Sequence, residues 1–466
     1  MGQTDAVPPP FEIVARLRPV DLVSPWTATA HDPAEFALPR PAPYAAITGT
    51  LNGDRASLSI ESGAIRLTGR YDAGRFALEV TDATGARTVH ASRRRGTAEG
   101  PVDELALTLT GTILTVFGRE SGRWVGRARY ALGDRVDVRD ETFLAGLEVR
   151  TTGDLEALSA GGFGQLGLRD LRFVTTAEGA PYRDAGRLWL TATHAGPGFF
   201  DAAHTGVWSF DPDTCELDHH ADLFFRRPDS AGVYGDNATH LVRDDDRWLV
   251  ATSTWGDFDH ARPAVRVSVT LAESRADLLR GTHVLDTRHL ELPTDGFTSV
   301  GVWDPHLVRI DGRWHVGFVS ARKYFAFHPV LAAGPTLDDL TLVAADTGRR
   351  ATEGTTLVRL DEGWRLLASD GRDGRRGQRA RYPVFDLALT ELGELDAPYP
   401  TNLPWPNLAR VDDGWLMVTF DGRPTGSDLL GYGTHGAVLV LRSEGRNDLV
   451  VDDQHRLDDP PVGVDA

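Results

Sequence analysis

The chain has 466 residues, 11 tryptophans, a single cysteine and a formal net charge of −18. This length predicts two domains, because a single hydrophobic core rarely grows beyond about 250–300 residues. One cysteine excludes a disulfide framework and any multi-cysteine metal site, and the acidic balance argues against nucleic acid or an anionic membrane as a partner. No apolar run approaches the ~20 residues of a membrane span, and the polar first ten residues lack the hydrophobic segment of a signal peptide. We therefore expect a cytoplasmic protein.

The first third of the chain shows the period-two alternation of half-buried antiparallel strands. The alternation is clear over 104–110, and Asn52-Gly53 suits a two-residue hairpin turn. We predict an N-terminal antiparallel β-sandwich over 1–155, followed by a small-residue linker over 156–166. Its role is open among glycan binding, completion of the rim of a binding pocket and dimerisation, and nothing indicates the oligomeric state.

An internal repeat follows the linker. Each copy consists of an apolar strand, an aspartate-rich tight turn and a tryptophan that opens a second strand. Close copies cover 241–248, 307–314, 357–364 and 408–415, and a looser copy ends at Trp189. Repeats spaced roughly 50–65 residues apart, with about four strands each, are typical of propeller blades. We predict an all-β chain in which a five-bladed β-propeller over 167–456 follows the sandwich and precedes a tail at 457–466. A long sandwich with chance hairpins is the alternative, which four near-identical turns disfavour.

Three acids stand at equivalent places in the aligned repeats, just before an innermost strand: Asp170, Asp304 and Glu353. The innermost strands of a propeller start at one mouth of its channel, so these side chains are expected to converge. Turn acids are the alternative, but the aspartate-rich turns lie at the opposite end of each strand. We therefore predict that the three carboxylates are catalytic.

Further residues near the same strand starts are candidates for substrate binding. They are Arg169, Asn237, Trp303, His306 and Trp405, together with the aromatic residues Trp255 and Phe200. Aromatic rings can stack on sugar faces, but each of these could equally pack between blades. The side chains of Arg169 and His306 could likewise be satisfied by a neighbouring blade.

The motifs Asp-Pro-x-Leu at 304–307 and Glu-Gly-x-x-Leu at 353–357, with Asp170 before the first inner strand, resemble glycoside hydrolase family 43. That family comprises five-bladed arabinanases, arabinofuranosidases and xylosidases, with relatives among the fructosidases. The resemblance implies a general base at Asp170, an acid-orienting and pKa-tuning residue at Asp304 and a general acid at Glu353.

The sequence departs from the family pattern in several places. Leu171 and Thr355 replace prolines of the motifs, Asn237 stands where a tryptophan is common, and the extra domain precedes the propeller. These departures indicate a divergent member. The sugar that it cleaves, the linkage and the choice between exo and endo action therefore cannot be inferred from the family.

Inverting hydrolysis of a glycoside needs a protonated acid and an ionised base about 6.5–9.5 Å apart. We predict a glycosidase that cleaves a furanoside or pentoside linkage of an oligosaccharide or glycoside, with no cofactor and no metal. A non-catalytic carbohydrate-binding propeller is one alternative. A retaining fructosidase or transferase, with carboxyl groups about 5–5.5 Å apart, is another.

Other motifs favour structural interpretations. Asp218-His219-His220-Ala221-Asp222 contains metal-ligand types, but we interpret it as a solvated loop. His435 stands where related enzymes often place an axial histidine beside a water or cation, and the sequence does not decide its role.

Overall fold

The computed structural model describes residues 8–25, 27, 29–31, 35–259, 266–411, 414–425 and 428–443. The predicted tail at 457–466 and the end of the predicted propeller at 444–456 lie outside the described residues, as do Asp412 and Asp413 of the last repeat. The described chain is nearly all β, with one short α-helix, α1 (Glu141–Ala145). The 3₁₀ turns are η1 (Gly133–Arg135), η2 (Phe200–Ala202), η3 (Asp428–Leu430) and η4 (Tyr432–Thr434). None of the helices in this part of the chain has the length and apolar character needed to cross a bilayer.

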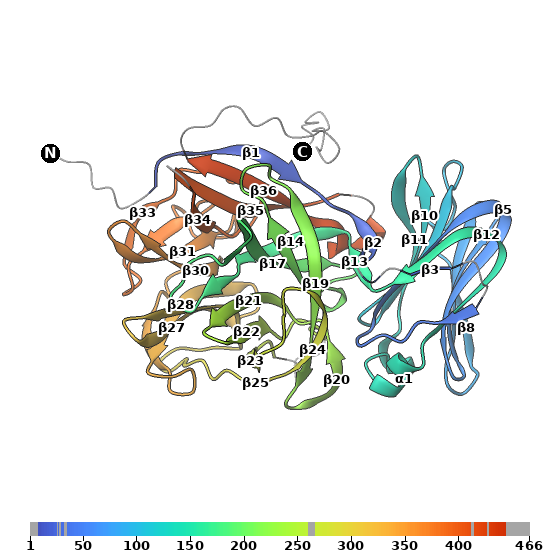
Figure 1. The fold of residues 1–466 in the computed structure, drawn as a ribbon, viewed down its shortest axis with the longest axis horizontal. Coiled ribbons are helices and arrows are strands. Elements are labelled where there is room, and N and C mark those ends of the chain that lie inside the picture. Colours follow the sequence, from blue (N-terminus) through green and yellow to red (C-terminus); the bar gives the residue numbers. More distant parts are fainter. Residues whose placement is uncertain are drawn as a thin grey trace.

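The N-terminal unit is a ten-stranded antiparallel sheet on one side of the molecule (Figure 1). Its strands are β3 (Thr29–His31), β4 (Glu35–Ala37), β5 (Tyr44–Ser62), β6 (Ile65–Asp72), β7 (Arg75–Thr81), β8 (Arg87–His90), β9 (Glu104–Thr110), β10 (Ile113–Glu120), β11 (Arg123–Ala131) and β12 (Glu148–Gly161). The long strand β5 pairs with β9 along its first half and with β6 along its second half. A Cβ on Gly69 of β6 would touch Val116 of β10 and Leu107 of β9, so the two halves pack face to face. The predicted antiparallel strands are present, but β5 and β12 join them into one continuous sheet rather than two separate sheets.

The remaining sheets have a propeller-like arrangement (Figure 1). Four of them, which we call blades 1 to 4, arise from the predicted propeller segment alone. Blade 1 contains β14 (Gly167–Phe173), β16 (Arg183–Asp184), β17 (Arg187–Ala195), β18 (His204–Phe210), β19 (Leu217–Arg227), β20 (Ser230–Tyr234) and β24 (Gly281–Asp286). Blade 2 contains β15 (Thr175–Thr176), β21 (Asn237–Asp244), β22 (Arg247–Ser253), β23 (Val269–Ser274) and β25 (Arg288–His289). Blade 3 contains β26 (Gly301–Ile310), β27 (Arg313–Lys323), β28 (Ala326–Gly334) and β29 (Thr341–Ala345), and blade 4 contains β30 (Thr352–Leu360), β31 (Gly363–Asp370), β32 (Pro383–Phe385) and β33 (Glu391–Glu394).

The last sheet, which we call the closing sheet, has mixed origin. It joins β34 (Asn407–Val411), β35 (Gly414–Pro424) and β36 (His435–Ser443) to β1 (Phe11–Leu17). β1 pairs antiparallel with β36, with Phe11 opposite Ser443. The prediction of five blades built from 167–456 is therefore wrong, and so is the assignment of β1 to the N-terminal domain. The next segment, β2 (Asp21–Val23), pairs with β13 (Phe163–Gln165) rather than with the ten-stranded sheet.

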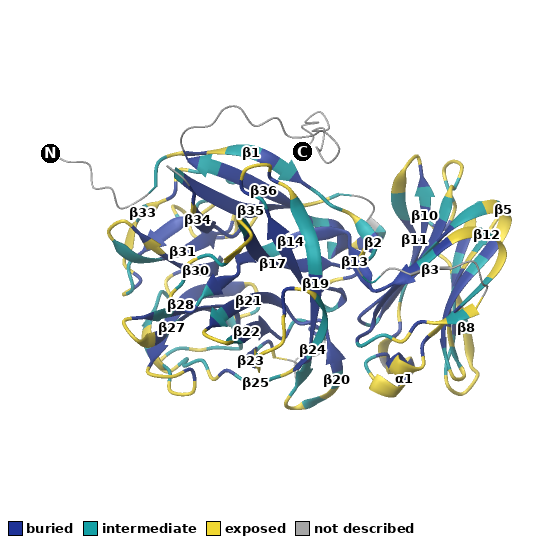
Figure 2. Ribbon diagram, in the orientation of Figure 1, coloured by how far each residue is buried: buried dark blue, intermediate teal, exposed yellow. Residues whose placement is uncertain are grey.

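The sequence repeat has a direct structural cause. Its arginine and tryptophan are opposite one another across each hairpin, as Arg309 and Trp314 are in blade 3. The guanidinium of Arg309 lies 5.5 Å from the Trp314 ring centre, and equivalent pairs occur in blade 2 and in the closing sheet. Each pair adds a cation–π contact to the rim of its hairpin, while the centres of the sheets are buried (Figure 2).

The segment 218–222, predicted to be a solvated loop, is part of strand β19. Asp222 is 1% exposed, and the side chain of His219 is 2% exposed. The prediction failed because this acidic and histidine-rich segment lacks the alternation of apolar residues that marks a buried strand. The face of β19 that carries Asp222 is nevertheless covered by the rest of the protein.

Candidate active site

The four inner strands share a bulge at the same place. The pairing register shifts between Arg169 and Arg172 in β14, and at the corresponding positions of β21, β26 and β30. Within each shift lies a residue with left-handed φ: Asp170 (51°), Ala238 (56°), Asp304 (56°) and Gly354 (69°). A bulge changes the direction of the side chains beside it. A non-glycine residue in the left-handed region is strained, and such residues occur mainly at functional sites. The repeat thus presents equivalent residues to one point at which inner strands meet.

That point is a cavity of about 210 Å³. It is lined by Arg169, Asp170, Phe200, Asn237, Ala238, Trp255, Phe258, Trp303, Asp304, Tyr324, Phe325, Phe327, Glu353, Asn402, Leu403, Trp405 and Tyr432. The structure therefore brings together every residue that the sequence analysis singled out for the site, except His306. A larger and more open cavity of about 670 Å³, which includes Asp295 and His328, contains none of the three predicted acids.

His306, predicted to bind substrate, is not among the residues that line the cavity and makes contacts between blades instead. It is 3% exposed, and its ring stacks on that of His240 with centres 4.0 Å apart. The backbone N–H of Leu357 donates to its Nδ1 (3.3 Å), and that of Leu307 donates to Nδ1 of His240 (3.0 Å). Burial lowers the pKa of His306 well below its usual range. Residues two apart share a face only in a regular strand, and the bulge between Trp303 and His306 interrupts that alternation between Asp304 and His306.

Arg172 is a central residue that the sequence analysis missed. It is fully buried, and its guanidinium donates to the carbonyl oxygens of Thr355 (2.8 Å) and Asp304 (2.9 Å). It also lies 4.6 Å from the ring centre of Trp405. Burial lowers its pKa to about 10, opposed by the nearby carboxylates of Asp304 and Asp170. Arg172 therefore links the starts of three inner strands and supplies positive charge beside the acids.

The three carboxyl groups have perturbed protonation equilibria. Burial, together with the charge of Asp170, raises the pKa of Glu353 to about 8, against weaker opposing interactions with Trp405 and Trp303. Burial and the charge of Glu353 raise the pKa of Asp304 well above its usual range. Burial also raises the pKa of Asp170, but Arg169 opposes this rise from 3.3 Å. Asp170 is thus the acid that is paired with a cation, at 3.3 Å, whereas burial and charge repulsion favour the protonated forms of both Glu353 and Asp304.

An aromatic wall lines one side of the cavity. The ring of Trp255 lies 4.7 Å from Phe200 and 5.2 Å from Trp303. Tyr324, which the sequence analysis did not single out, stacks parallel to Trp303 at 6.3 Å. The ring of Tyr432 lies 5.2 Å from that of Phe200, and the Arg169 guanidinium lies 4.4 Å from the ring centre of Tyr432. Tyr324 and Tyr432 belong to connections between strands, where the repeat gives no aligned position that could have marked them.

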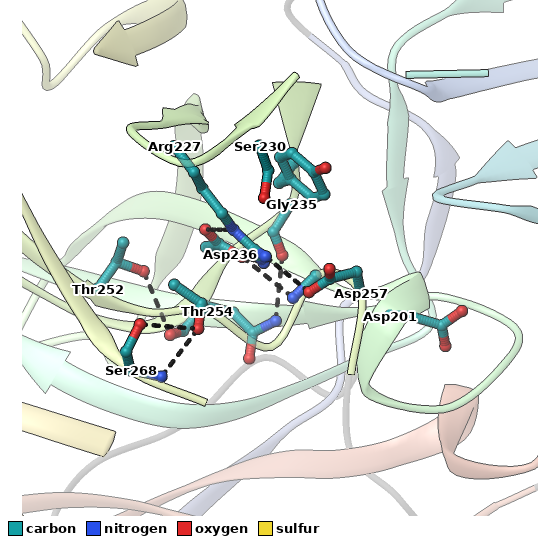
Figure 3. Close-up of polar contacts among 12 residues, drawn as sticks. Asp201, Arg227, Ser230, Gly235, Asp236, Thr252, Thr254, Asp257 and Ser268 are labelled. Carbon is teal, nitrogen blue, oxygen red and sulfur yellow. Dashed lines mark hydrogen bonds and ion pairs between the residues drawn. The ribbon is translucent and has the colours of Figure 1, made fainter. Parts of the chain in front are cut away.

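A buried ion-pair network positions this wall (Figure 3). Arg227 donates to both carboxylate oxygens of Asp236 and to Asp257 (Nη1 to Oδ1, 2.6 Å). The backbone N–H of Gly256 in turn donates to Asp236 (3.0 Å). The network fixes the connection that carries Trp255 against the start of strand β21, where Asn237 enters the cavity.

His435, whose role the sequence left undecided, is not among the lining residues of the cavity. Its ring stacks on Tyr432 with centres 4.1 Å apart, and burial lowers its pKa to about 3. His435 therefore supports the tyrosine that packs against Arg169.

No family model matches the chain, and no curated protein matches it. Several solved structures resemble it at low identity. A family 117 glycoside hydrolase of Zobellia galactanivorans is 12% identical, with a TM-score of 0.43 over 59% of this chain and 84% of its own. Levansucrase of Bacillus subtilis is 10% identical, with a TM-score of 0.44 over 63% and 89%. A GH43_1 enzyme of Xanthomonas citri in complex with xylose is 14% identical, with a TM-score of 0.40 over 60% and 90%. At these values the structures resemble the chain and assign no activity to it.

Proposed function

We propose that the chain is a glycoside hydrolase whose active site is the cavity at the bulges of the inner strands. The observation that carries the proposal is the convergence of Asp170, Asp304 and Glu353, from three different blades, on one aromatic-lined cavity. Paired carboxyl groups with separated proton affinities are the machinery of glycoside hydrolysis. Aromatic rings beside them supply faces on which a sugar ring can stack.

The protonation states support an assignment of roles. Glu353, with a pKa of about 8, carries its proton at neutral pH and would deliver it to the leaving oxygen as general acid. Asp170, paired with Arg169 at 3.3 Å, is the acid most readily ionised and would hold the attacking water as general base. Asp304 has a buried Oδ2 with no hydrogen-bond partner in the described part of the chain. Burial and the charge of Glu353 raise the pKa of Asp304 well above its usual range, and the neighbouring charge that raises the pKa of Glu353 is that of Asp170.

These roles amount to an inverting mechanism in which water attacks the anomeric carbon directly. Asp170 accepts the proton of the water as the new bond forms. Glu353 gives its proton to the departing oxygen as the old bond breaks, so that the proton count balances. The cavity of about 210 Å³ favours a substrate that inserts one terminal sugar. We propose that the substrate is a furanoside or a pentoside.

The proposal is tested by turnover on a panel of aryl arabinofuranosides, aryl xylosides, arabinan and sucrose. We expect the wild type to release sugar from at least one furanoside or pentoside. On a substrate without an activated leaving group, Asp170→Asn and Glu353→Gln should each lose about 10²–10⁴-fold in kcat. Product anomers followed by NMR should show inversion. Binding of oligosaccharide with no release of sugar from any panel member would instead identify a non-catalytic binder. Release with retention would identify Asp170 as a nucleophile, the fructosidase-like alternative.

A further inference from the structure

The N-terminal unit contacts three connections that carry aromatic residues of the cavity. The first connection, 196–203 between β17 and β18, carries Phe200. The second is the segment of η3 and η4, which carries Tyr432, and the third begins after β22 and carries Trp255. None of the lining residues of the cavity comes from the described part of the N-terminal unit itself. The unit therefore lies behind the aromatic wall rather than in it.

Tyr44 of β5 holds the end of the first connection. Its hydroxyl donates to the carbonyl oxygen of Ala203 (2.7 Å), and the residue is 1% exposed. A Cβ on Gly235, two residues before Asn237, would overlap this hydroxyl, so the glycine leaves room for it. The hydrogen bond thus fixes the backbone directly after η2, the turn that begins at Phe200.

The turn between β9 and β10 holds the same connection at Asp201. Oγ1 of Thr112 donates to Oδ2 of Asp201 (3.3 Å). A Cβ on Gly111, whose φ is 56°, would overlap the carbonyl oxygen of Asp201, so the two backbones are in contact. Burial raises the pKa of Asp201, and the charge of Arg139 and the bond from Thr112 oppose this rise. Asp201 is thus a buried acid of the junction with the N-terminal unit.

The second connection is fixed by apolar packing and by the first connection. Leu430 of η3 is 2% exposed, and a Cβ on Gly126 of β11 would overlap its Cδ2. The backbone N–H of Gly198 donates to the carbonyl oxygen of Leu430 (3.2 Å), and that of Tyr432 donates to the carbonyl oxygen of Gly198 (3.0 Å). The rings of Phe200 and Tyr432 therefore depend on the same contacts with the N-terminal unit.

Arg139 reaches the third connection. It ends the segment 132–139, which follows β11 and whose apolar side chains belong to the core of the N-terminal unit. The guanidinium of Arg139 donates to the carbonyl oxygen of Gly256 (2.7 Å), the residue after Trp255. In all three connections, a contact with the N-terminal unit falls within two residues of the aromatic side chain that the connection carries.

We propose that the N-terminal unit positions the aromatic wall of the active site, with Tyr44, Thr112 and Arg139 as positioning residues. These residues do not touch the substrate, but they hold the rings on which a sugar would stack. The inference rests on the proposed function, because it gives the unit a role in binding the substrate of that cavity. The alternative is a junction that stabilises the fold and leaves substrate binding unaffected.

The test uses variants of the full-length protein that each remove one hydrogen bond. Tyr44→Phe and Thr112→Val both release the connection 196–203 while keeping nearly the same side-chain shape. Their matched controls are Tyr71→Phe on β6 and Thr152→Val on β12, whose contacts lie within the N-terminal unit. Each of the two test variants examines the same connection separately, so a folding defect in one leaves the other informative.

Hydrogen exchange followed by mass spectrometry measures the positioning without any substrate. Losing a buried hydrogen bond should speed exchange of the amides of Gly198 and Ala203 about two- to tenfold in both test variants. Arg139→Ala should do the same for the amides of Gly256 and Phe258. The two controls should exchange these amides at the wild-type rate.

Steady-state kinetics on the sugar that the panel identifies measures the effect on binding. We expect KM to rise about two- to tenfold in Tyr44→Phe and Thr112→Val, because the ring of Phe200 is less well placed for stacking. We expect kcat to stay within about twofold, because the three carboxyl groups keep their positions. Both controls should keep the wild-type KM.

Three outcomes would contradict these expectations, and they can be told apart. Unchanged exchange and unchanged KM in both test variants would overturn the positioning role. Faster exchange with an unchanged KM would show that the contacts only stabilise the junction, which also overturns it. A wild type that neither cleaves nor binds any sugar of the panel would overturn the proposed function, and with it the role in substrate binding.

Discussion

The bulge that shapes the cavity can be tested at Gly354. This residue has a φ of 69°, and a Cβ built on it would overlap Cδ1 and Cγ of Trp405. The Trp405 ring is buried and lies against Arg172, so it has little room to move. Gly354→Ala therefore adds the cost of left-handed backbone, about 1–2 kcal/mol, to an overpacking cost of about 1–3 kcal/mol. We expect the free energy of unfolding to fall by about 2–5 kcal/mol.

Urea unfolding followed by circular dichroism measures this change. Ala238→Gly is the matched control, because Ala238 occupies the same position in blade 2 with a φ of 56°. Removing its Cβ relieves strained backbone but loosens the unfolded chain, so we expect a change within about 1 kcal/mol. If Gly354→Ala lowers the free energy of unfolding by less than about 1 kcal/mol, the ring of Trp405 is not packed against Gly354 as described here.

Three further predictions follow from charge and exposure. Because the pKa of Glu353 rises from 4.5 to about 8 on folding, the folded state retains a proton that the unfolded state releases, and stability should fall as pH rises from about 4.5 to about 8. Glu353→Gln should flatten this dependence in urea unfolding at pH 5 and pH 8, and an unchanged slope would contradict the shift. Asp236→Asn removes one charge of the buried pair with Arg227 and should lower the free energy of unfolding by about 3–5 kcal/mol. The control Asp72→Asn, in an exposed pair with Arg55, should lower it by less than about 1 kcal/mol. Equal losses in the two variants would refute the argument from burial. Phe325, 63% exposed on the cavity lining, should be replaceable by Ala with little loss of stability, but the variant should bind an oligosaccharide substrate about two- to tenfold more weakly in calorimetry; unchanged affinity would exclude it from the binding surface.

The repeat was readable from sequence because its signal is local. An arginine and a tryptophan separated by a tight turn mark each hairpin, as with Arg309 and Trp314. The alignment of these hairpins also placed Asp170, Asp304 and Glu353 near the starts of inner strands, and all three line the cavity. Their catalytic roles stay predictions.

Features that depend on distant partners were not readable. β1 is a short strand whose partner, β36, lies at the other end of the chain, and nothing local distinguishes it from a sandwich strand. The place of His306 depended on the backbone conformation of Asp304, which a period-two pattern does not reveal. Asp222 contacts histidines of β17 and β18, so its burial shows only in the folded chain.

The most direct test of the central claim compares leaving groups in Glu353→Gln. A general acid is needed for a poor leaving group and is dispensable for a good one. Using the sugar that the panel identifies, we expect Glu353→Gln to hydrolyse a dinitrophenyl glycoside at a rate near that of the wild type. The same variant should lose about 10²–10⁴-fold in kcat on the corresponding oligosaccharide. Equal losses on both substrates, or no loss on either, would contradict the assignment of Glu353 as the acid and with it the proposed active site.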